Sequence, residues 1–459
     1  MGISELKHVV RPLPNGGQVV VLDTGAVITA EDCAMLQAMY SRSPASLFVH
    51  LEKLANVGSG KFMEQFYVGY GHKSIGDCGD VVIFIEGVSM LVAKAVQDWM
   101  LYRGQECSTR YLDFSRQLFL NPSGLAQADC ILEVWRRFYT DNLPLVREHV
   151  AQQFPINPSE DEKIYIKAIS ARAFDIMRSF LPAGAETSLS WTVDLRQAAD
   201  KLRELRNHPL EEVKLVAEAI ESALSEVYPN SFNHKCYEAT EDYYHDWMKG
   251  DYFLVLAPYD EWPCEVTLVR QGIDKSQLRD YESFLVNRPP KTELPKKFAR
   301  AGVAQFHWLL DFGSYRDLQR HRAVIQLMPV LTADYGFEPW YLEQLPEGLR
   351  TKVTETILPS FERELEVMAD RIGILDCQYL IPMGYRVPCE VTGDLPALVY
   401  LVELRSGSAV HPTMRRRAQQ LAQILETEFG PVGLKLHIDW SDIGRFDIKR
   451  GQQDIIQKQ

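Results

Sequence analysis

A dense group of cationic side chains lies at Arg320, His321 and Arg322, next to an apolar stretch that reads as a helix. Arginine side chains bind phosphate or carboxylate groups through two parallel hydrogen bonds. The spacing of Arg316 and Arg320 would place two guanidinium groups on one face of a helix. This pattern predicts an anion-binding site, and a solvated basic surface is the alternative reading.

A turn of small residues, "ECSTRY", could bind a phosphate as well. It contains Glu106, Ser108, Thr109 and Arg110. Hydroxyl groups, a guanidinium and the amide groups of a turn can together surround a phosphate. The alternative is an ordinary polar turn after a helix. We expect Cys107 in this turn to fill space rather than to act as a nucleophile, although the nearby arginine could lower the pKa of its thiol.

Three further segments carry isolated functional groups. Arg178 precedes the apolar stretch "SFLP", so it reads as a buried arginine that requires an acid or an anionic ligand as its partner. His72 and Ser74 in "GHKS" precede a strand-like segment, and a lone histidine there is usually structural. Arg206 ends a helical run shortly before Pro209.

Bulk properties restrict the class of protein. The chain has 459 residues, which suggests about two to three domains, and its net charge is -13. Binding to nucleic acid or to a membrane surface through overall charge is therefore not expected. The eight cysteines are scattered without a CxxC pair, so we expect neither a metal site nor disulfides and predict a cytoplasmic protein. We see no signal peptide and no membrane span.

The elements that must position these residues can be read from hydrophobic periodicity. Residues 19–25 and 81–87 read as strands that end in glycine, and apolar residues from Val88 to Trp99 recur at helical spacing. A second helix is expected after Pro209, with acidic residues in its first turn. These patterns predict an α+β fold in which small sheets pack against long helices.

The two halves of the chain show the same order of features. "RSFLPAG" at residues 178–184 is matched by "QYLIPMG" at residues 378–384, and Leu205–Arg206 is matched by Leu404–Arg405. This order predicts a tandem duplication of a unit of about 200 residues. We place one unit at residues 1–245 and the other at residues 246–459, with a polar, aromatic-rich linker at residues 233–252 whose role stays open.

The quoted segments together resemble the flavin-dependent thymidylate synthases, the ThyX family. The order in the first half is "GHKS", "ECSTRY", "RSFLP" and "WTVDLR", followed by "ELR", and it covers about residues 41–232. The family's R-H-R motif is replaced in the first half by Asp98, Trp99 and Met100, with Arg103 and Gln105 where serine and asparagine stand in the family. The match therefore lies in the combination of segments and their order.

The second half shows the opposite loss. It keeps the R-H-R motif, but Ile325, Leu327, Val330 and Thr332 stand where the family has Ser, Asn, Ser and Arg, and Gln378 stands at the position of Arg178. Family members are homotetramers whose active sites lie where subunits meet. We therefore expect a composite site with the nucleotide loop from the first half and the R-H-R motif from the second, formed within one chain or across a homodimer that mimics the tetramer.

The resemblance implies a role for each matching residue. Arg206 would activate the uracil ring and is the expected catalytic residue. The residues expected to bind the substrate are Glu106, Ser108, Thr109, Arg110, Arg178 and Arg320. The residues expected to bind the cofactor are His72, Ser74, Asp194, Arg196, His321 and Arg322. Asp194 replaces a family asparagine, and Asp317 replaces a glutamine near the nucleotide; aspartate only accepts hydrogen bonds, whereas an amide also donates them.

The implied reaction is the reductive methylation of dUMP, with FAD as cofactor and with NADPH and methylene-tetrahydrofolate as co-substrates. Two alternatives remain open at this stage. One is a related flavoenzyme that modifies C5 of a uridine nucleotide differently, for example by hydroxymethylation. The other is a protein that binds a nucleotide or flavin without catalysis, as the partial loss of the motif in each half would allow.

Overall fold

The computed structural model describes residues 7–23, 28–40, 43, 45–69, 72–107, 109, 112–233, 235–253, 262–327 and 329–441. The chain divides into two compact units. The first unit comprises residues 1–108 and 185–253, and the second comprises residues 109–184 and 254–459. This grouping differs from the predicted boundary near residue 245, because the segment 109–184 from the first half of the sequence packs within the second unit.

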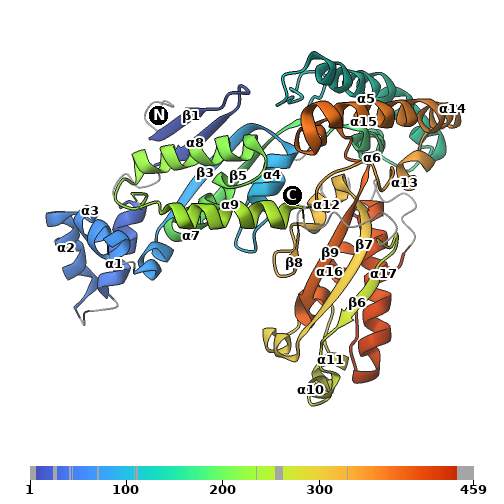
Figure 1. The fold of residues 1–459 in the computed structure, drawn as a ribbon. Coiled ribbons are helices and arrows are strands. Elements are labelled where there is room, and N and C mark those ends of the chain that lie inside the picture. Colours follow the sequence, from blue (N-terminus) through green and yellow to red (C-terminus); the bar gives the residue numbers. More distant parts are fainter. Residues whose placement is uncertain are drawn as a thin grey trace. The chain divides into compact units, whose positions relative to one another are not determined.

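The first unit contains a five-stranded antiparallel sheet (Figure 1). In spatial order its strands are β1 (His8–Pro12), β2 (Gln18–Leu22), β3 (Asp80–Ser89), β5 (Glu186–Asp194) and β4 (Arg103–Glu106). Val81, Ile83 and Ile85 of β3 are completely buried, and the residues between them are more exposed, as expected for a strand with one face toward a core. The predicted strand at residues 81–87 thus forms the centre of this sheet.

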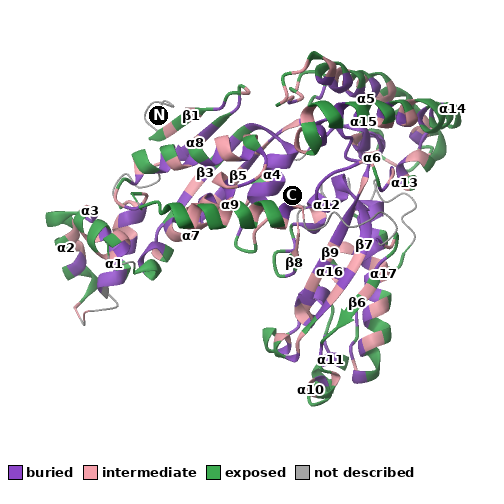
Figure 2. Ribbon diagram, viewed as in Figure 1, coloured by how far each residue is buried: buried purple, intermediate pink, exposed green. Residues whose placement is uncertain are grey.

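Helices complete the first unit, and α8 packs against β1 and β2. They are α1 (Ala30–Tyr40), α2 (Leu47–Val57), α3 (Gly60–Phe62), η2 (Met63–Gly69), η3 (Lys73–Cys78), α4 (Met90–Gln97), α7 (Leu195–Arg206), α8 (Glu211–Val227) and α9 (Glu238–Tyr252). Every residue of α4 is buried, which agrees with its apolar periodicity (Figure 2). Most of the predicted linker forms α9, which contacts α7.

The second unit contains a four-stranded antiparallel sheet. In spatial order its strands are β6 (Thr267–Gln271), β7 (Val303–Asp311), β9 (Arg386–Asp394) and β8 (Ile325–Gln326). Its longer helices are α5 (Ala126–Gln153), α6 (Glu162–Met177), α15 (Leu358–Cys377), α16 (Leu395–Arg405) and α17 (Pro412–Phe429). Its shorter helices are η5 (Arg178–Phe180), α10 (Lys275–Arg279), α11 (Glu282–Val286), η7 (Lys296–Ala301), α12 (Phe312–Leu318), α13 (Pro339–Glu343), α14 (Glu347–Lys352), η8 (Val353–Ile357), η9 (Gln378–Leu380) and η10 (Gly430–Val432).

The two sheets repeat one topology, with β2-β3-β5-β4 matching β6-β7-β9-β8. Strands β5 and β9 each end in an aspartate, Asp194 or Asp394, whose side chain accepts a hydrogen bond from the third residue of the helix that follows. On the neighbouring strands, Arg103 lies opposite Thr192, and Ile325 lies opposite Thr392. Arg103 and Ile325 are therefore equivalent, which places Asp98–Met100 at the positions of Arg320–Arg322, as the sequence comparison expected.

The two proline segments of the repeats pair with each other inside the second unit. Pro182 and Pro382 form an antiparallel bridge. Ala183 N donates to Ile381 O and Met383 N donates to Leu181 O, both at 2.9 Å. Residues 200 positions apart thus exchange the same contacts, which is the pattern of a two-fold axis between equivalent segments. This pairing brings Arg178, just before Pro182 in the sequence, into the unit that carries the R-H-R motif.

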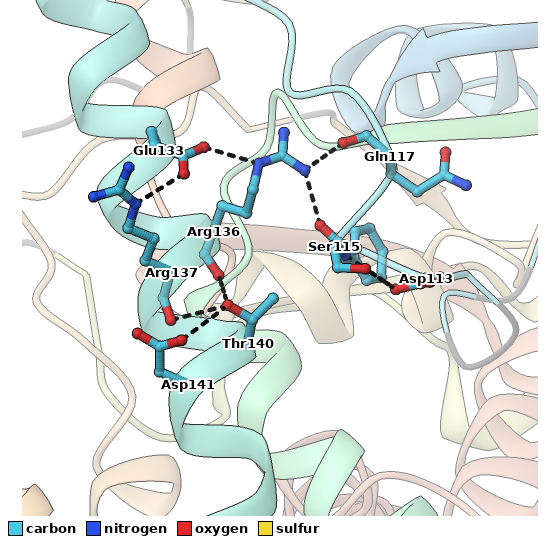
Figure 3. A network of polar contacts seen from close by, with 9 residues as sticks. Asp113, Ser115, Gln117, Glu133, Arg136, Arg137, Thr140 and Asp141 are labelled. Carbon is cyan, nitrogen blue, oxygen red and sulfur yellow. Dashed lines mark hydrogen bonds and ion pairs between the residues drawn. The ribbon is translucent and has the colours of Figure 1, made fainter.

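Helix α5 contacts the segment at residues 112–119, which follows the predicted nucleotide loop (Figure 3). The Arg136 guanidinium donates to the backbone carbonyls of Phe114 at 2.9 Å and Gln117 at 2.5 Å, and it lies 4.2 Å from the centre of the Phe119 ring. Trp135 on the same helix is buried against Phe361 of α15, at a ring distance of 5.1 Å. These contacts explain why residues 112–119 belong to the second unit.

The predicted α+β class is confirmed, with a small sheet and helices in each half of the sequence. Within the described ranges, no helix combines the length and the apolar composition needed to cross a bilayer.

Candidate nucleotide site

The R-H-R motif lies in the turn that follows α12 in the second unit. The Asp311 carboxylate caps this helix by accepting from Ser314 N at 2.8 Å. The helix ends at Leu318, and His321 N donates to Leu318 O in the following turn. Arg320 therefore lies just beyond the helix on which its spacing from Arg316 had placed it, because a tight turn replaces a further helical turn. Arg320 and Arg322 are exposed.

His321 is buried, with 4% of its surface exposed. Its Nε2 accepts a hydrogen bond from Arg405 Nε at 2.6 Å. Burial, followed by the positive charge of Arg405, lowers the pKa of His321 to about 3, so the imidazole is neutral near neutral pH. Because Nε2 accepts, the proton of the neutral ring lies on Nδ1. Nδ1 is buried and has no hydrogen-bond partner among the described residues, so it presents an unused donor.

Asp317 lies among four arginines. Burial alone would raise the pKa of its carboxyl group, but Arg178, Arg405, Arg320 and Arg316 together lower that pKa below its usual range. Two of these contacts are long, at 3.9 Å to Arg320 Nε and 3.9 Å to Arg405 Nη1. Asp175 and Asp311 also act on Arg178, so the four guanidinium groups share this region with several carboxylates.

Arg178 joins this cluster from the end of α6. Its Nε and Nη2 are buried and have no hydrogen-bond acceptor among the described residues. Tyr341, Asp175 and Asp317 are the groups whose charge acts on it most strongly. A buried guanidinium remains charged, and an unpaired buried N–H is costly to keep. The side chain thus offers two donors without a described acceptor, which suits a bound anion.

Arg405 was not among the residues predicted to act in the site. The sequence reading paired it with Arg206 because each follows a leucine. The aspartates that cap α7 and α16 show a different equivalence. Arg405 lies 11 residues after Asp394, whereas Arg206 lies 12 residues after Asp194. Leu205 is therefore the residue equivalent to Arg405. One residue changes the direction of a side chain on a helix by about 100°. The number of residues between the capping aspartate and the arginine was the sequence signal that could have shown that Arg206 and Arg405 are not equivalent.

Arg206 is held by two carboxylates within the first unit. Its Nε and Nη2 donate to Glu241 of α9 at 2.9 and 2.6 Å, and its Nη1 donates to Glu221 of α8 at 2.5 Å. This geometry is a bidentate pair with one acid and a further bond to another. All three nitrogens of the guanidinium are thus engaged by the protein itself, which the sequence did not predict.

Glu106 ends β4 and is also engaged in the first unit. Its carboxylate accepts from Lys94 Nζ at 3.0 Å and from Gln97 Nε2 at 2.9 Å, and the side chains of both ions are buried. Thr109, in the second unit, is buried with 4% exposure. Ser108 and Arg110, the other two residues of the predicted phosphate turn, lie outside the described residues.

The other residues expected to contact a cofactor lie in the first unit. His72 and Ser74 are exposed at the start of η3. Asp194 accepts from Gln197 N at 2.8 Å, and burial raises the pKa of its carboxyl group. Arg196 forms ion pairs with Asp77 and, at 3.5 Å, with Asp200. Acidic groups thus surround Arg196, so the anionic diphosphate of a dinucleotide does not fit these contacts as they stand.

Comparisons with known proteins show what this chain is similar to. Residues 28–230 match the family model described as "Thymidylate synthase complementing protein". The chain is 24% identical to a UPF0159 protein of Chlamydia muridarum, over 86% of this chain and 84% of that protein. It is 25% identical to a UPF0159 protein of Thermoplasma acidophilum, over 77% of this chain and 83% of that protein. The match to this family model over residues 28–230 confirms the resemblance to the flavin-dependent ThyX family found in the sequence.

Proposed function

We propose that this protein is an enzyme related to thymidylate synthase that binds a uridine nucleotide, dUMP, at the arginine cluster around Asp317. The observation that carries the proposal is the pair of buried, unpartnered donors on Arg178. Hydrogen bonds from a guanidinium to a phosphate are strong because both partners are charged. A nucleotide phosphate would satisfy these donors, and the other arginines around Asp317 would lie near its charge.

In this proposal the two halves of the sequence complete each other within the second unit. Arg178 and Thr109 come from the first half, and Arg320, His321 and Arg405 come from the second. We assign the activation of the uracil ring to Arg405, because Arg405 contacts His321 while Arg206 is engaged by Glu221 and Glu241. A guanidinium beside the ring would stabilise the negative charge that develops on the ring during C5 chemistry.

FAD is the cofactor that the family implies, and the second unit fits a flavin better than the first. The buried Nδ1–H of His321 is a donor for which no described residue supplies an acceptor, and Arg322 is an exposed cation next to it. These two residues would hold the flavin, whereas Arg196 is already paired with acids. When bound, FAD would carry the hydride that NADPH supplies.

The reaction that we propose is the reductive methylation of dUMP, with methylene-tetrahydrofolate as the source of carbon. A homodimer would provide four ThyX-like units and so match the family's tetramer. The second candidate is another modification of C5, such as hydroxymethylation. It is favoured by Asp317, which stands where the family has glutamine and which is ionised among the arginines.

The test is the absorption spectrum of the purified protein with FAD, recorded with and without dUMP. We expect flavin bands that shift when dUMP is added, because nucleotide and flavin would lie side by side. Protein that binds dUMP but no FAD would leave only a nucleotide-binding role. Protein that binds neither ligand would refute the proposal.

A further inference from the structure

A cavity of about 200 Å³ in the second unit lies where α13, α17 and β9 begin. Its lining shares no residue with the arginine cluster around Asp317. Its lining contains three guanidinium groups and three carboxylates, which belong to Arg386, Arg416, Arg417, Glu265, Glu338 and Glu343. Arg416 and Glu265 pair with each other at 3.0 Å on the exposed side. Of the other four, Arg417 and Glu338 are buried, Arg386 is half-buried and Glu343 is exposed, so the inner part of the cavity presents both signs of charge.

Arg417 supplies the buried positive charge. Only 7% of this residue is exposed. Its Nε donates to Leu309 O at 3.0 Å and its Nη1 donates to Gln420 Oε1 at 3.1 Å. Its Nη2 has no acceptor within hydrogen-bonding distance in the described part of the chain. A guanidinium at the wall of a cavity favours a negatively charged group in that cavity.

The first unit shows that this arginine is not needed for the fold. Buried positions of α8 recur 201 residues later in α17, as in the pairs Val213/Met414, Ala217/Ala418 and Ile220/Leu421. The residue of α8 at the position of Arg417 is the fully packed Val216. A buried charge is less favourable than a packed valine unless it has a partner. Arg417 therefore needs partners that Val216 does not, and a ligand carboxylate in the cavity would add to the two acceptors that the protein supplies.

Glu338 supplies the buried negative charge, also with 7% exposure. Its Oε1 accepts from Trp340 N at 3.4 Å. No described residue donates a hydrogen bond to its Oε2. Arg417 lies near enough to act on Glu338 electrostatically, but the two do not form an ion pair within 4.0 Å. A separation that prevents direct pairing leaves room for a ligand that carries both charges.

We propose that this cavity binds a small zwitterion, namely a free α-amino acid. Its carboxylate would lie at Arg417 and Arg386, and its ammonium group at Glu338 and Glu343. The Trp340 and Pro339 side chains in the lining would receive a modest apolar side chain. The volume is below that of sites for drug-sized ligands, which agrees with a ligand of this size. The inference is independent of the proposed nucleotide chemistry.

The experiment is saturation-transfer NMR on the full chain with a mixture of the common α-amino acids, each at about 1 mM. The variants are Glu338→Gln and Arg417→Val, the second of which restores the residue that α8 carries. The matched control is Arg363→Gln, at an exposed position on α15. Acetate and methylamine, tested separately, carry one charge each.

We expect saturation transfer from the protein to at least one amino acid. The affinity for that amino acid should be lower by about tenfold or more in both cavity variants and unchanged in the control. Arg417→Val should melt at the same temperature as the wild type or higher. Absence of binding by every amino acid would overturn the proposal. Acetate that binds as tightly as the amino acids would show an anion site and overturn the proposal. Affinity unchanged by Glu338→Gln would overturn it too, even if Arg417→Val does not fold.

Discussion

Replacement of Arg178 by methionine should abolish nucleotide binding while leaving the folded protein about as stable as before. Methionine keeps an unbranched side chain of similar length but removes every donor. In the free protein, the buried Nε and Nη2 have no described acceptor, so their removal eliminates a desolvation cost. The lost attraction to Tyr341, Asp175 and Asp317 offsets this gain. We therefore expect the free energy of unfolding to change by no more than about 1 kcal/mol.

The effect on binding should be much larger. Two charge-assisted hydrogen bonds are worth about 3 to 6 kcal/mol together, which corresponds to a loss in affinity of about a hundredfold to ten-thousandfold. Equilibrium dialysis with dUMP and with deoxyuridine measures this loss, and urea denaturation measures stability. The wild type should prefer dUMP because of its phosphate, and Arg178→Met should lose that preference. Arg363→Met on the exposed face of α15 is the control.

A purely structural arginine would give the reverse result. Arg178→Met would then lower the free energy of unfolding by about 3 kcal/mol or more, as expected when a buried ion pair is broken. The preference for dUMP over deoxyuridine would persist in whatever folded protein remained. That combination would refute the assignment of Arg178 to the phosphate.

Three further predictions concern other ionisable side chains that are buried or half-buried. Lys94→Met should lower the free energy of unfolding by about 3 to 5 kcal/mol because it removes the cation that pairs with the buried Glu106 carboxylate, and urea denaturation should show that Lys94→Met/Glu106→Met recovers most of the loss; a single variant as stable as the wild type would contradict this. Burial first, and then nearby lysines, lower the pKa of His208 to about 3, so the unfolded chain binds the proton first as the pH falls, and stability relative to His208→Asn should drop by about 3 kcal/mol between about pH 7 and about pH 4. Parallel pH profiles would contradict that expectation. In turnover assays Arg405→Met should abolish product formation, whereas Arg206→Met should mainly lower stability by leaving Glu241 unpaired; loss of turnover in folded Arg206→Met would return the ring-activating role to Arg206.

Local sequence patterns were sufficient for much of the fold. The alternation in residues 81–87 predicted the central strand β3, and the apolar spacing after Val88 predicted the buried helix α4. Acidic residues after Pro209 located α8. The repeated proline segments indicated a duplication, and the structure shows those segments paired around Pro182 and Pro382. These features depend on neighbouring residues in the chain, so a single sequence reveals them.

Other features depend on contacts between distant segments. The pairing of Glu241 with Arg206 joins α9 to α7, and nothing in either segment alone specifies it. The equivalence of Arg405 with Leu205 rather than Arg206 follows from the position of the capping aspartate, which a match of the dipeptide overlooks. The cavity at Arg417 likewise arises from three separate elements. Tertiary packing, not local preference, determines each of these.

The most direct test of the account is mass analysis of the nucleotide after incubation of the purified protein with FAD, NADPH, methylene-tetrahydrofolate and dUMP. The account predicts a product that carries one additional methyl group, formed by the wild type and not by Arg178→Met. A hydroxymethyl product would redirect the account to the second candidate reaction. Unchanged dUMP in the presence of bound flavin would contradict its central claim.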